Sequence, residues 1–235
     1  MKKSINSFRA AGVLMACLSP LALASAAYSD TTYGPFPVTV KGYSGSKTNS
    51  VSYTGQIARH VLHDSLKKLA SKGDGGANAA NLQAEMMAYF GGSDNNKAII
   101  SPVDKGDFNI KQETLNEISK GKNLSGKSYK GVVNGWPGQM TGAEVLASMI
   151  EHAAATKGGF DPATGFNYPQ LISKFAMGAV FYNQAVDNYL DEKLAADNKP
   201  NSKPYKDGAH YTGKEHVWDE AFGYWGAAAH SLNLS

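Results

Sequence analysis

The chain has 235 residues, of which 42% are hydrophobic and 18% are charged, and its formal net charge is +3. A chain of this length can bury a sizeable core without covalent crosslinks. Its only cysteine, Cys17, excludes an intrachain disulfide.

The N-terminal segment has the features of a secretory signal. A basic start is followed by an apolar run over 10–24, and Ala24 and Ala26 are the small residues of a cleavage site. We therefore predict that residues 1–26 direct export to the periplasm or the cell surface and are then removed. Cys17 lies in this segment, so the mature chain has no thiolate ligand for a metal ion.

Lipid anchoring through Cys17 is the alternative to simple removal of the signal. The sequence Leu14-Met-Ala-Cys loosely resembles the motif at which bacterial lipoproteins are lipidated. The apolar run continues past Cys17 to Ala24, where a lipidated chain normally becomes polar. We therefore expect cleavage after Ala26.

The positive charge of the chain belongs to the signal. Without Lys2, Lys3 and Arg9 the mature chain has 20 basic and 20 acidic residues. A nucleic-acid-binding surface needs a concentrated basic stripe, and only short basic pairs remain, so we exclude nucleic acid as a partner. No later stretch has the roughly 20 apolar residues of a membrane-spanning helix.

The mature chain, 27–235, is predicted to be one all-α domain. Residues 27–53 are rich in Tyr, Gly, Ser and Pro, which indicates a short extended N-terminal arm. Apolar residues then recur at three- and four-residue spacing. We predict a bundle of five to six helices, with candidate segments near 55–71, 79–90, 111–120, 141–157, 168–196 and 214–232.

Two of these helices have clear start signals. Thr141 and Glu144 have the spacing of a capping box, and Pro169 stands in the first turn of the 168–196 segment, where its missing N–H costs nothing. Within that segment, 175–186 is apolar or small on every side of a helical wheel. A helix of this kind is normally surrounded by others, so we predict that it is the centre of the bundle.

The last segment, KEHVWDEAFGYWGAAAH, has two unusual sides. Aromatic and apolar residues follow a 4-3-4-3 spacing on one side, which predicts a core stripe of Trp218, Phe222, Trp225, Ala229 and Leu232. The opposite side alternates titratable and small residues: His216, Glu220, Gly223, Ala227 and His230, with Asp219 beside them. Small residues allow close approach of another backbone, so we expect this polar side to be packed as well.

Three interpretations of the polar side remain open. His216 with Glu220 or Asp219 can converge on one metal ion, as in helical-bundle metal sites, with Glu144 or Glu151 of the 141–157 helix reaching across as further ligands. Imidazole and carboxylate without thiolate suit iron or zinc. The alternatives are a buried structural hydrogen-bond network and an ordinary surface pair. His60 and His63 lie away from the apolar stripe of their helix and are predicted to be solvated.

Several segments resemble a known family. YTGQIARHVLHDSLKKL, GFDPATGFNYPQ and HVWDEAFGYWG look like the DUF4856 family of exported bacterial proteins, over nearly the whole mature chain. Proteins of that family are longer, so the resemblance implies that this chain is truncated at its C-terminus.

A more distant similarity connects GKEHVWDEAFGYWG to the G-x-H-x-x-E segment of imelysin-like proteins. His216 matches the histidine of that segment and Asp219 the acidic residue. Gly213 stands one residue too early, and the acid is Asp with Glu220 next to it. The likeness implies a helical envelope protein linked to iron uptake or, in one branch, a peptidase.

These observations favour an exported, non-enzymatic binding protein, for a metal ion such as iron, in envelope metal acquisition. His216, Asp219 and Glu220, with Glu144 or Glu151, are the expected ligands. The first alternative is a metallopeptidase at the same site, in which a metal-bound water attacks a peptide carbonyl. The second is a helical module that holds an envelope protein or a glycan on its Trp and Tyr surface, the polar stripe being structural.

Overall fold

The computed structural model describes residues 35–91, 97–100, 114–118 and 123–225, all within one compact unit, Thr32–Ser235. The predicted all-α class is confirmed, because the regular structure of the described residues consists of six α-helices, one π-helix, two short 3-10 turns and a single two-stranded hairpin. The predicted signal segment, Cys17 and half of the predicted 111–120 helix lie outside those residues. So do Ala227, Ala229, His230 and Leu232 of the last segment.

The elements follow the chain in this order: α1 (Thr54–Ala70), α2 (Ala79–Gly91), η1 (Leu115–Glu117), α3 (Leu124–Lys127), α4 (Gly142–Ala155), η2 (Lys157–Gly159), β1 (Phe160–Asp161), β2 (Phe166–Asn167), α5 (Tyr168–Ala176), η3 (Met177–Ala195) and α6 (Gly213–Trp225). β1 and β2 pair antiparallel around the turn at 162–165.

Local signals set the helix starts as predicted. The Thr141 N–H donates to Oε2 of Glu144 at 2.8 Å, and the Glu144 N–H donates back to Oγ1 of Thr141, so α4 begins with a complete capping box. Asn167 caps α5 by accepting the Gln170 N–H at 3.2 Å, and Pro169 stands in the first turn.

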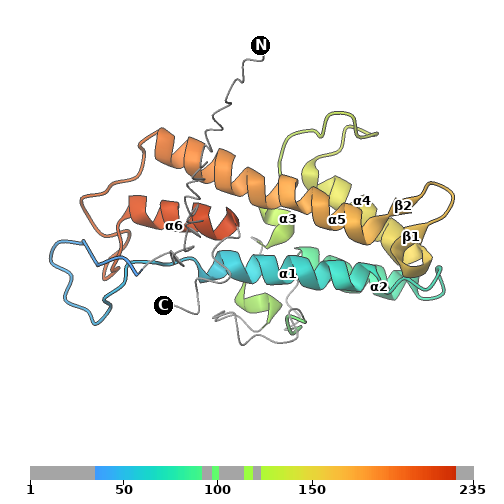
Figure 1. The fold of residues 1–235 in the computed structure, drawn as a ribbon, viewed down its shortest axis with the longest axis horizontal. Helices are drawn as coiled ribbons and strands as arrows, with labels where there is room; N and C mark the ends of the chain where they lie inside the picture. The colour runs from blue at the N-terminus through green and yellow to red at the C-terminus, as the bar shows by residue number, and fades with distance from the viewer. Residues whose placement is uncertain (1–34, 92–96, 101–113, 119–122, 226–235) are drawn as a thin grey trace, which may run out of the picture. The chain divides into compact units, whose positions relative to one another are not determined.

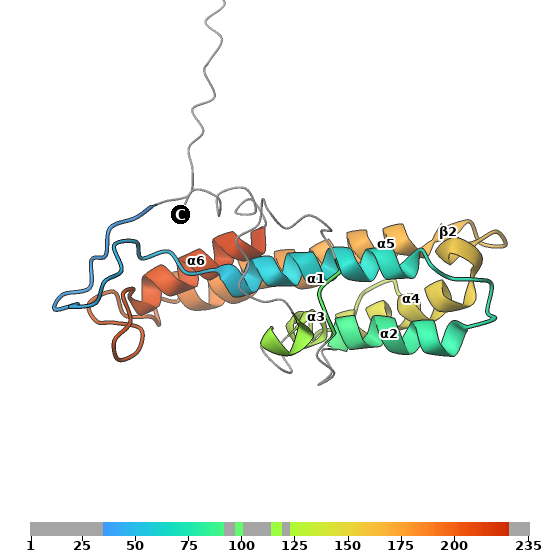
Figure 2. The same ribbon diagram turned by 90° about the horizontal axis from the view of Figure 1, so that it is seen from below.

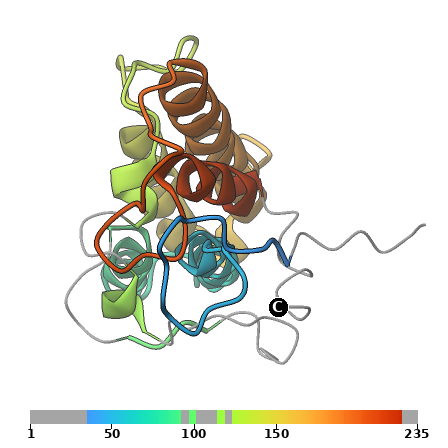
Figure 3. The same cartoon turned by 90° about the vertical axis from the view of Figure 1, so that its left-hand side faces the viewer.

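Two long helices run side by side through the compact unit. α1 lies along the continuous helix formed by α5 and η3, and α2 and α4 pack together at one end of this pair (Figures 1 and 2). At the other end α6 lies against η3 and the first half of α1, as the end-on view also shows (Figure 3). The unit therefore has an α2–α4 end and an α6 end. No helix in the described part has both the length and the apolar character needed to cross a bilayer.

The core joins the facing sides of these helices. The apolar stripes predicted for 55–71 and 141–157 are confirmed, since their members are at most 3% exposed: Ile57, Val61, Leu62, Leu66, Leu69, Val145, Leu146, Met149, Ile150 and Ala153. Each such side chain stabilises the fold by about 1.5–3 kcal/mol relative to the exposed state.

The prediction that 175–186 is the centre of the bundle is wrong. Met177 and Tyr182 are 51% and 55% exposed, so η3 has one open side. η3 continues α5 with π-type turns, in which the Ala196 N–H bonds the Asp191 carbonyl five residues back. The wider turns change the spacing of each face, which a wheel drawn for an ordinary α-helix does not describe.

The described part of the predicted extended arm, 35–53, lies against α6. Oγ1 of Thr39 donates to Oε1 of Glu215 at 2.6 Å, and Val40 is buried. The arm is held by an isolated bridge between Pro37 and Asn49. It leads directly into α1 at Tyr53, which is 2% exposed.

Candidate functional site

The polar side of α6 faces inward, as predicted from its small residues. Asp219 is 4% exposed, and Gly223 is buried against α1. A Cβ built at Gly223 would lie 2.8 Å from Cβ of Gln56 and 2.9 Å from Cβ of Tyr53. Because both atoms are attached directly to the backbone, only glycine permits this approach of α6 to α1.

The aromatic side of α6 faces outward, so the predicted core stripe is wrong in its described part. Trp218 and Trp225 are 52% and 63% exposed, whereas Val217, Ala221 and Tyr224 are buried. The helix has turned its polar side inward because that side finds hydrogen-bond partners on α1 and η3, which removes the cost of burying it. Tyr224 supplies the large apolar contact that the tryptophans were expected to make.

Glu220 is the centre of a partly buried polar cluster. Its Oε1 accepts a hydrogen bond from Nε2 of Gln56 at 2.7 Å. Tyr189 of η3 also interacts with this carboxylate, since its pKa is raised strongly, first by burial and then by the charge of Glu220. Oε2 of Glu220 lies 3.6 Å from Nε2 of His216. Groups from α1, η3 and α6 therefore meet at one carboxylate.

His216 is held between two tyrosine rings. Its imidazole is stacked on Tyr211 with centroids 4.9 Å apart, and the Tyr205 ring lies 4.3 Å away on a tilted plane. Burial lowers the pKa of His216 more than the Glu220 charge raises it, so the neutral ring is favoured near neutral pH. Nδ1 is buried and has no hydrogen-bond partner among the residues that the structure describes.

Positive charge surrounds the tyrosines of this cluster. Nζ of Lys193 lies 3.6 Å from the Tyr189 ring centroid, and Nζ of Lys127 lies 5.9 Å from both the Tyr189 and Tyr224 rings. The Arg59 guanidinium, only 3% exposed, lies 5.7 Å from the Tyr224 ring. Arg59 acts to lower the pKa of Tyr189, so it favours the phenolate.

Asp219 holds the arm against α6. Its Oδ2 accepts the Ser52 N–H at 2.8 Å, which connects the residues before α1 to α6. A buried carboxylate that accepts a backbone N–H is satisfied without any ligand. Asp219 thus points to the arm, while Glu220 points to Gln56 and Tyr189.

The two glutamates predicted to reach across from α4 lie elsewhere. Glu144 is exposed at the start of α4, where its hydrogen bonds with Thr141 lower its pKa. Glu151 is exposed on the same helix. In the described part of the chain, no three His, Cys, Asp or Glu side chains come together as a group able to hold a metal ion. On α6 His216 lies beside Glu220, whereas Asp219 is turned to the arm, and Glu144 and Glu151 do not join them.

His60 and His63 are largely buried, so the prediction that they are solvated is wrong. Nε2 of His60 lies 3.0 Å from the carbonyl oxygens of Gly223 and Tyr224, and Nε2 of His63 lies 3.1 Å from that of Ser173. Carbonyls only accept, so each Nε2 carries the proton. Burial lowers the pKa of both rings, to about 4 for His60.

These imidazoles connect three helices. The His60 ring stacks on Phe181 of η3 with centroids 4.0 Å apart, while its Nε2 bonds α6. Both histidines line a hollow of about 490 Å³ together with Tyr224 and Trp225. Sequence reasoning missed the role of His60 and His63 because the residues that they contact lie 110 or more positions away. It missed Tyr189 because no local pattern connects η3 to Glu220.

Comparison with known proteins gives one match. The family model described as a domain of unknown function, DUF4856, covers residues 42–234. Comparisons with curated proteins and with solved structures found no match. The distant likeness to imelysin-like proteins is not shown and stays a prediction. Since the match covers far more than half of its residues, the chain belongs to the DUF4856 family.

Proposed function

We propose that this chain is an exported, non-catalytic binding protein that holds one metal ion, of the iron(III) or zinc type, at Glu220. The supporting observation is that His216 and Tyr189 converge on the same carboxylate from two helices. The proposal keeps two of the residues expected from sequence, His216 and Glu220, and adds Tyr189. Asp219, Glu144 and Glu151 are left out because of their other contacts and positions.

The spacing of the donor atoms suits a shared ion. Nitrogen and oxygen ligands lie about 2.0–2.2 Å from a tetrahedral ion, so two of them are roughly 3.4 Å apart. Nε2 of His216 and Oε2 of Glu220 are 3.6 Å apart, slightly beyond hydrogen-bond range. A small side-chain shift would bring both atoms to one ion, and Tyr189 already interacts with the same carboxylate.

The chemistry of the donors selects the kind of ion. A neutral imidazole, a carboxylate and a phenol without thiolate suit zinc and iron, and exclude a preference for copper(I). The phenol must lose its proton to become a strong ligand; burial and the charge of Glu220 oppose this loss, and Arg59 favours it. Binding therefore releases a proton and should strengthen as pH rises.

The burial and the hydrogen bond of Asp219 favour metal binding over peptide hydrolysis. A metallopeptidase needs a carboxylate near the metal-bound water to act as base. Asp219 is 4% exposed and its Oδ2 accepts the Ser52 N–H. Glu220, the other carboxylate on this side of α6, is used as a ligand.

The experiment is a measurement of metal content. Purified mature protein is incubated with iron(III) citrate or with zinc, passed through a desalting column and analysed for both elements. We expect about one bound ion per chain in the wild type and loss of the bound ion in His216→Ala. The control His152→Ala, which removes an exposed histidine of α4, should keep the ion. Absence of bound metal in the wild type, or equal content in all three proteins, would overturn the proposal.

A further inference from the structure

A groove along η3 lies apart from the α6 site. One hollow of about 490 Å³ lies between η3 and the residues around Tyr129, and a second of similar size continues it toward Lys127 and Glu192. The two share Tyr129, Asn183 and Asp187, so together they form one elongated groove. We infer that this groove binds a saccharide chain, an inference that does not depend on the proposed metal site.

The groove has a fixed aromatic wall. Tyr129 is 41% exposed, yet its backbone is held on both sides: its N–H donates to the Ala179 carbonyl at 2.7 Å, and its carbonyl accepts the Gly142 N–H at 3.1 Å. A Cβ at Gly142 would come within 3.0 Å of that carbonyl, so glycine lets α4 begin here. The Tyr129 ring is therefore presented to solvent by a rigid backbone.

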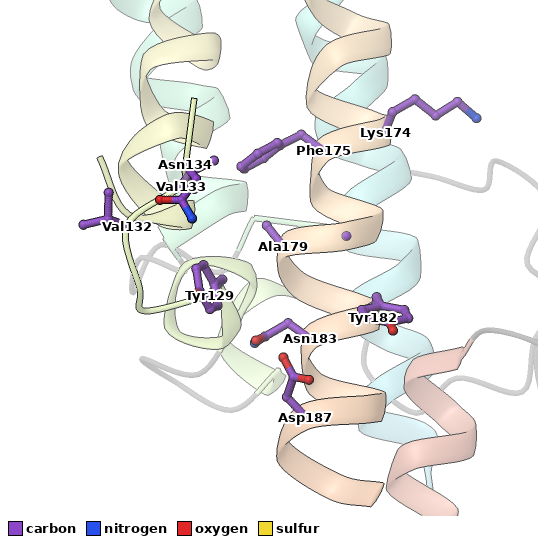
Figure 4. Close-up of a pocket in the computed structure, with 11 residues that line it drawn as sticks. Tyr129, Val132, Val133, Asn134, Lys174, Phe175, Ala179, Tyr182, Asn183 and Asp187 are labelled. Atoms are coloured by element: carbon purple, nitrogen blue, oxygen red, sulfur yellow. The ribbon is translucent and has the colours of Figure 1, made fainter. Parts of the chain in front are cut away.

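The opposite wall is apolar at Phe175 and Ala179 and polar at Asn183 and Asp187, which have unused hydrogen-bonding groups. Phe175, Ala179, Asn183 and Asp187 follow one another at four-residue spacing along the helix and face the groove (Figure 4). Among the described residues, neither the Asn183 nor the Asp187 side chain has a hydrogen-bond or ion-pair partner. Beyond them, Gln184 and Asn188 are bonded to each other at 2.9 Å, and Gln184 is bonded to the Lys127 carbonyl.

This combination selects a sugar over other ligands. An apolar ligand would cover Asn183 and Asp187 without satisfying them, which costs free energy. A peptide that adds as a β-strand needs a free sheet edge, which η3 does not offer because its backbone groups bond within the helix. A sugar ring presents a C–H face that can lie on the Tyr129 ring, and its hydroxyls donate to Asp187 and pair with the Asn183 amide. Two adjoining hollows suit more than one ring.

The test uses four soluble oligosaccharides: tetramers of β-1,4-linked N-acetylglucosamine, β-1,4-linked glucose, α-1,4-linked glucose and β-1,3-linked glucose. Affinity is measured by titration calorimetry on the whole mature protein. We expect at least one tetramer to bind. Tyr129→Ala should lower the affinity for that tetramer about three- to tenfold, and Tyr129→Phe should leave the affinity unchanged. Asn183→Ala should also lower the affinity for the same tetramer, independently of the change at Tyr129.

Phe166→Ala is the matched control, because Phe166 is 48% exposed on the β1–β2 hairpin, away from the groove. Tyr129 and Asn183 are not buried, so these variants should fold, which circular dichroism verifies. Failure of all four tetramers to bind at millimolar concentration would overturn the inference. So would an affinity that Tyr129→Ala and Phe166→Ala change equally, or binding of unstructured peptides in place of every tetramer.

Discussion

The two ends of the compact unit are built differently. At the α2–α4 end, buried side chains such as Met86, Leu146 and Ile150 are aliphatic or thioether groups, and polar residues such as Glu144 serve the helix cap. At the α6 end, Asp219, Arg59 and Gln56 are at most 5% exposed. Burial of apolar area explains the composition of the α2–α4 end. Burying charges costs free energy unless they are paired, so the second end has a composition that stability alone does not require.

The largest effect should come from the aliphatic end. Leu146 is fully buried, so Leu146→Ala should lower the free energy of unfolding by about 2–5 kcal/mol through lost transfer energy and a cavity. Chemical denaturation measures this loss, and metal content per folded chain should not change. A loss of metal binding in the folded variant would show that the two ends are not separate in function.

Acid should destabilise the α6 end selectively. The pKa of His60 is about 4 in the folded protein and about 6.5 when unfolded, so above pH 6.5 both states are neutral and the ring has no effect. As pH falls from 6.5 toward 4, the unfolded state binds the proton preferentially. The fold should therefore lose on the order of 3 kcal/mol from this residue.

The control for acid sensitivity is His60→Gln, whose side-chain amide can still donate to the Gly223 and Tyr224 carbonyls. Denaturation curves across this pH range should be flatter for the variant than for the wild type. The slope should not vanish, since burial also lowers the pKa of His63 and His216. Identical slopes in the two proteins would contradict a buried His60.

The contact of α6 with α1 can be tested with paired glycine substitutions. Gly223→Ala places a Cβ 2.8 Å from Cβ of Gln56, so the helices must separate, at a cost of about 1–3 kcal/mol. Gly178→Ala, in η3, meets nothing within 4 Å and should stabilise the fold slightly, through helix propensity. Equal thermal melting temperatures for the two variants would show that the close approach is absent.

The smallest effect is expected on the outer side of α6. Trp218 is 52% exposed, so Trp218→Ser should change the free energy of unfolding by about 0.5 kcal/mol or less. If the aromatic stripe were the core side of the helix, as the sequence pattern predicts, the loss would be about 3–5 kcal/mol. Denaturation of this variant therefore decides which side of α6 is buried.

The fold was predictable wherever local signals decide the outcome. The capping box of Thr141 and Glu144 and the stripe from Val145 to Ala153 are contained within one helix, and both were confirmed. The same cap explains why Glu144 is not near His216: its carboxylate is already used by the Thr141 N–H. A ligand assigned from spacing alone ignores such local hydrogen bonds.

The site was less predictable because α6 offered two sides with opposite signals. Hydrophobicity predicts that Trp218 and Trp225 are buried, while Gly223 indicates close packing on the other side. The second signal was correct, because Gln56, Ser52 and Tyr189 satisfy the polar groups there. These partners lie far away in sequence, so a pattern within α6 does not identify them.

The most direct test of a metal ion at Glu220 is the visible spectrum after addition of iron(III). An iron-bound tyrosinate gives a phenolate-to-iron charge-transfer band that carboxylate or imidazole ligands alone do not produce. We predict that the wild type and Tyr182→Phe, which changes a tyrosine 55% exposed on η3, develop the band, and that Tyr189→Phe does not. A band of equal intensity in Tyr189→Phe, or no band in the wild type at any pH at which it is folded, would contradict iron binding through Tyr189.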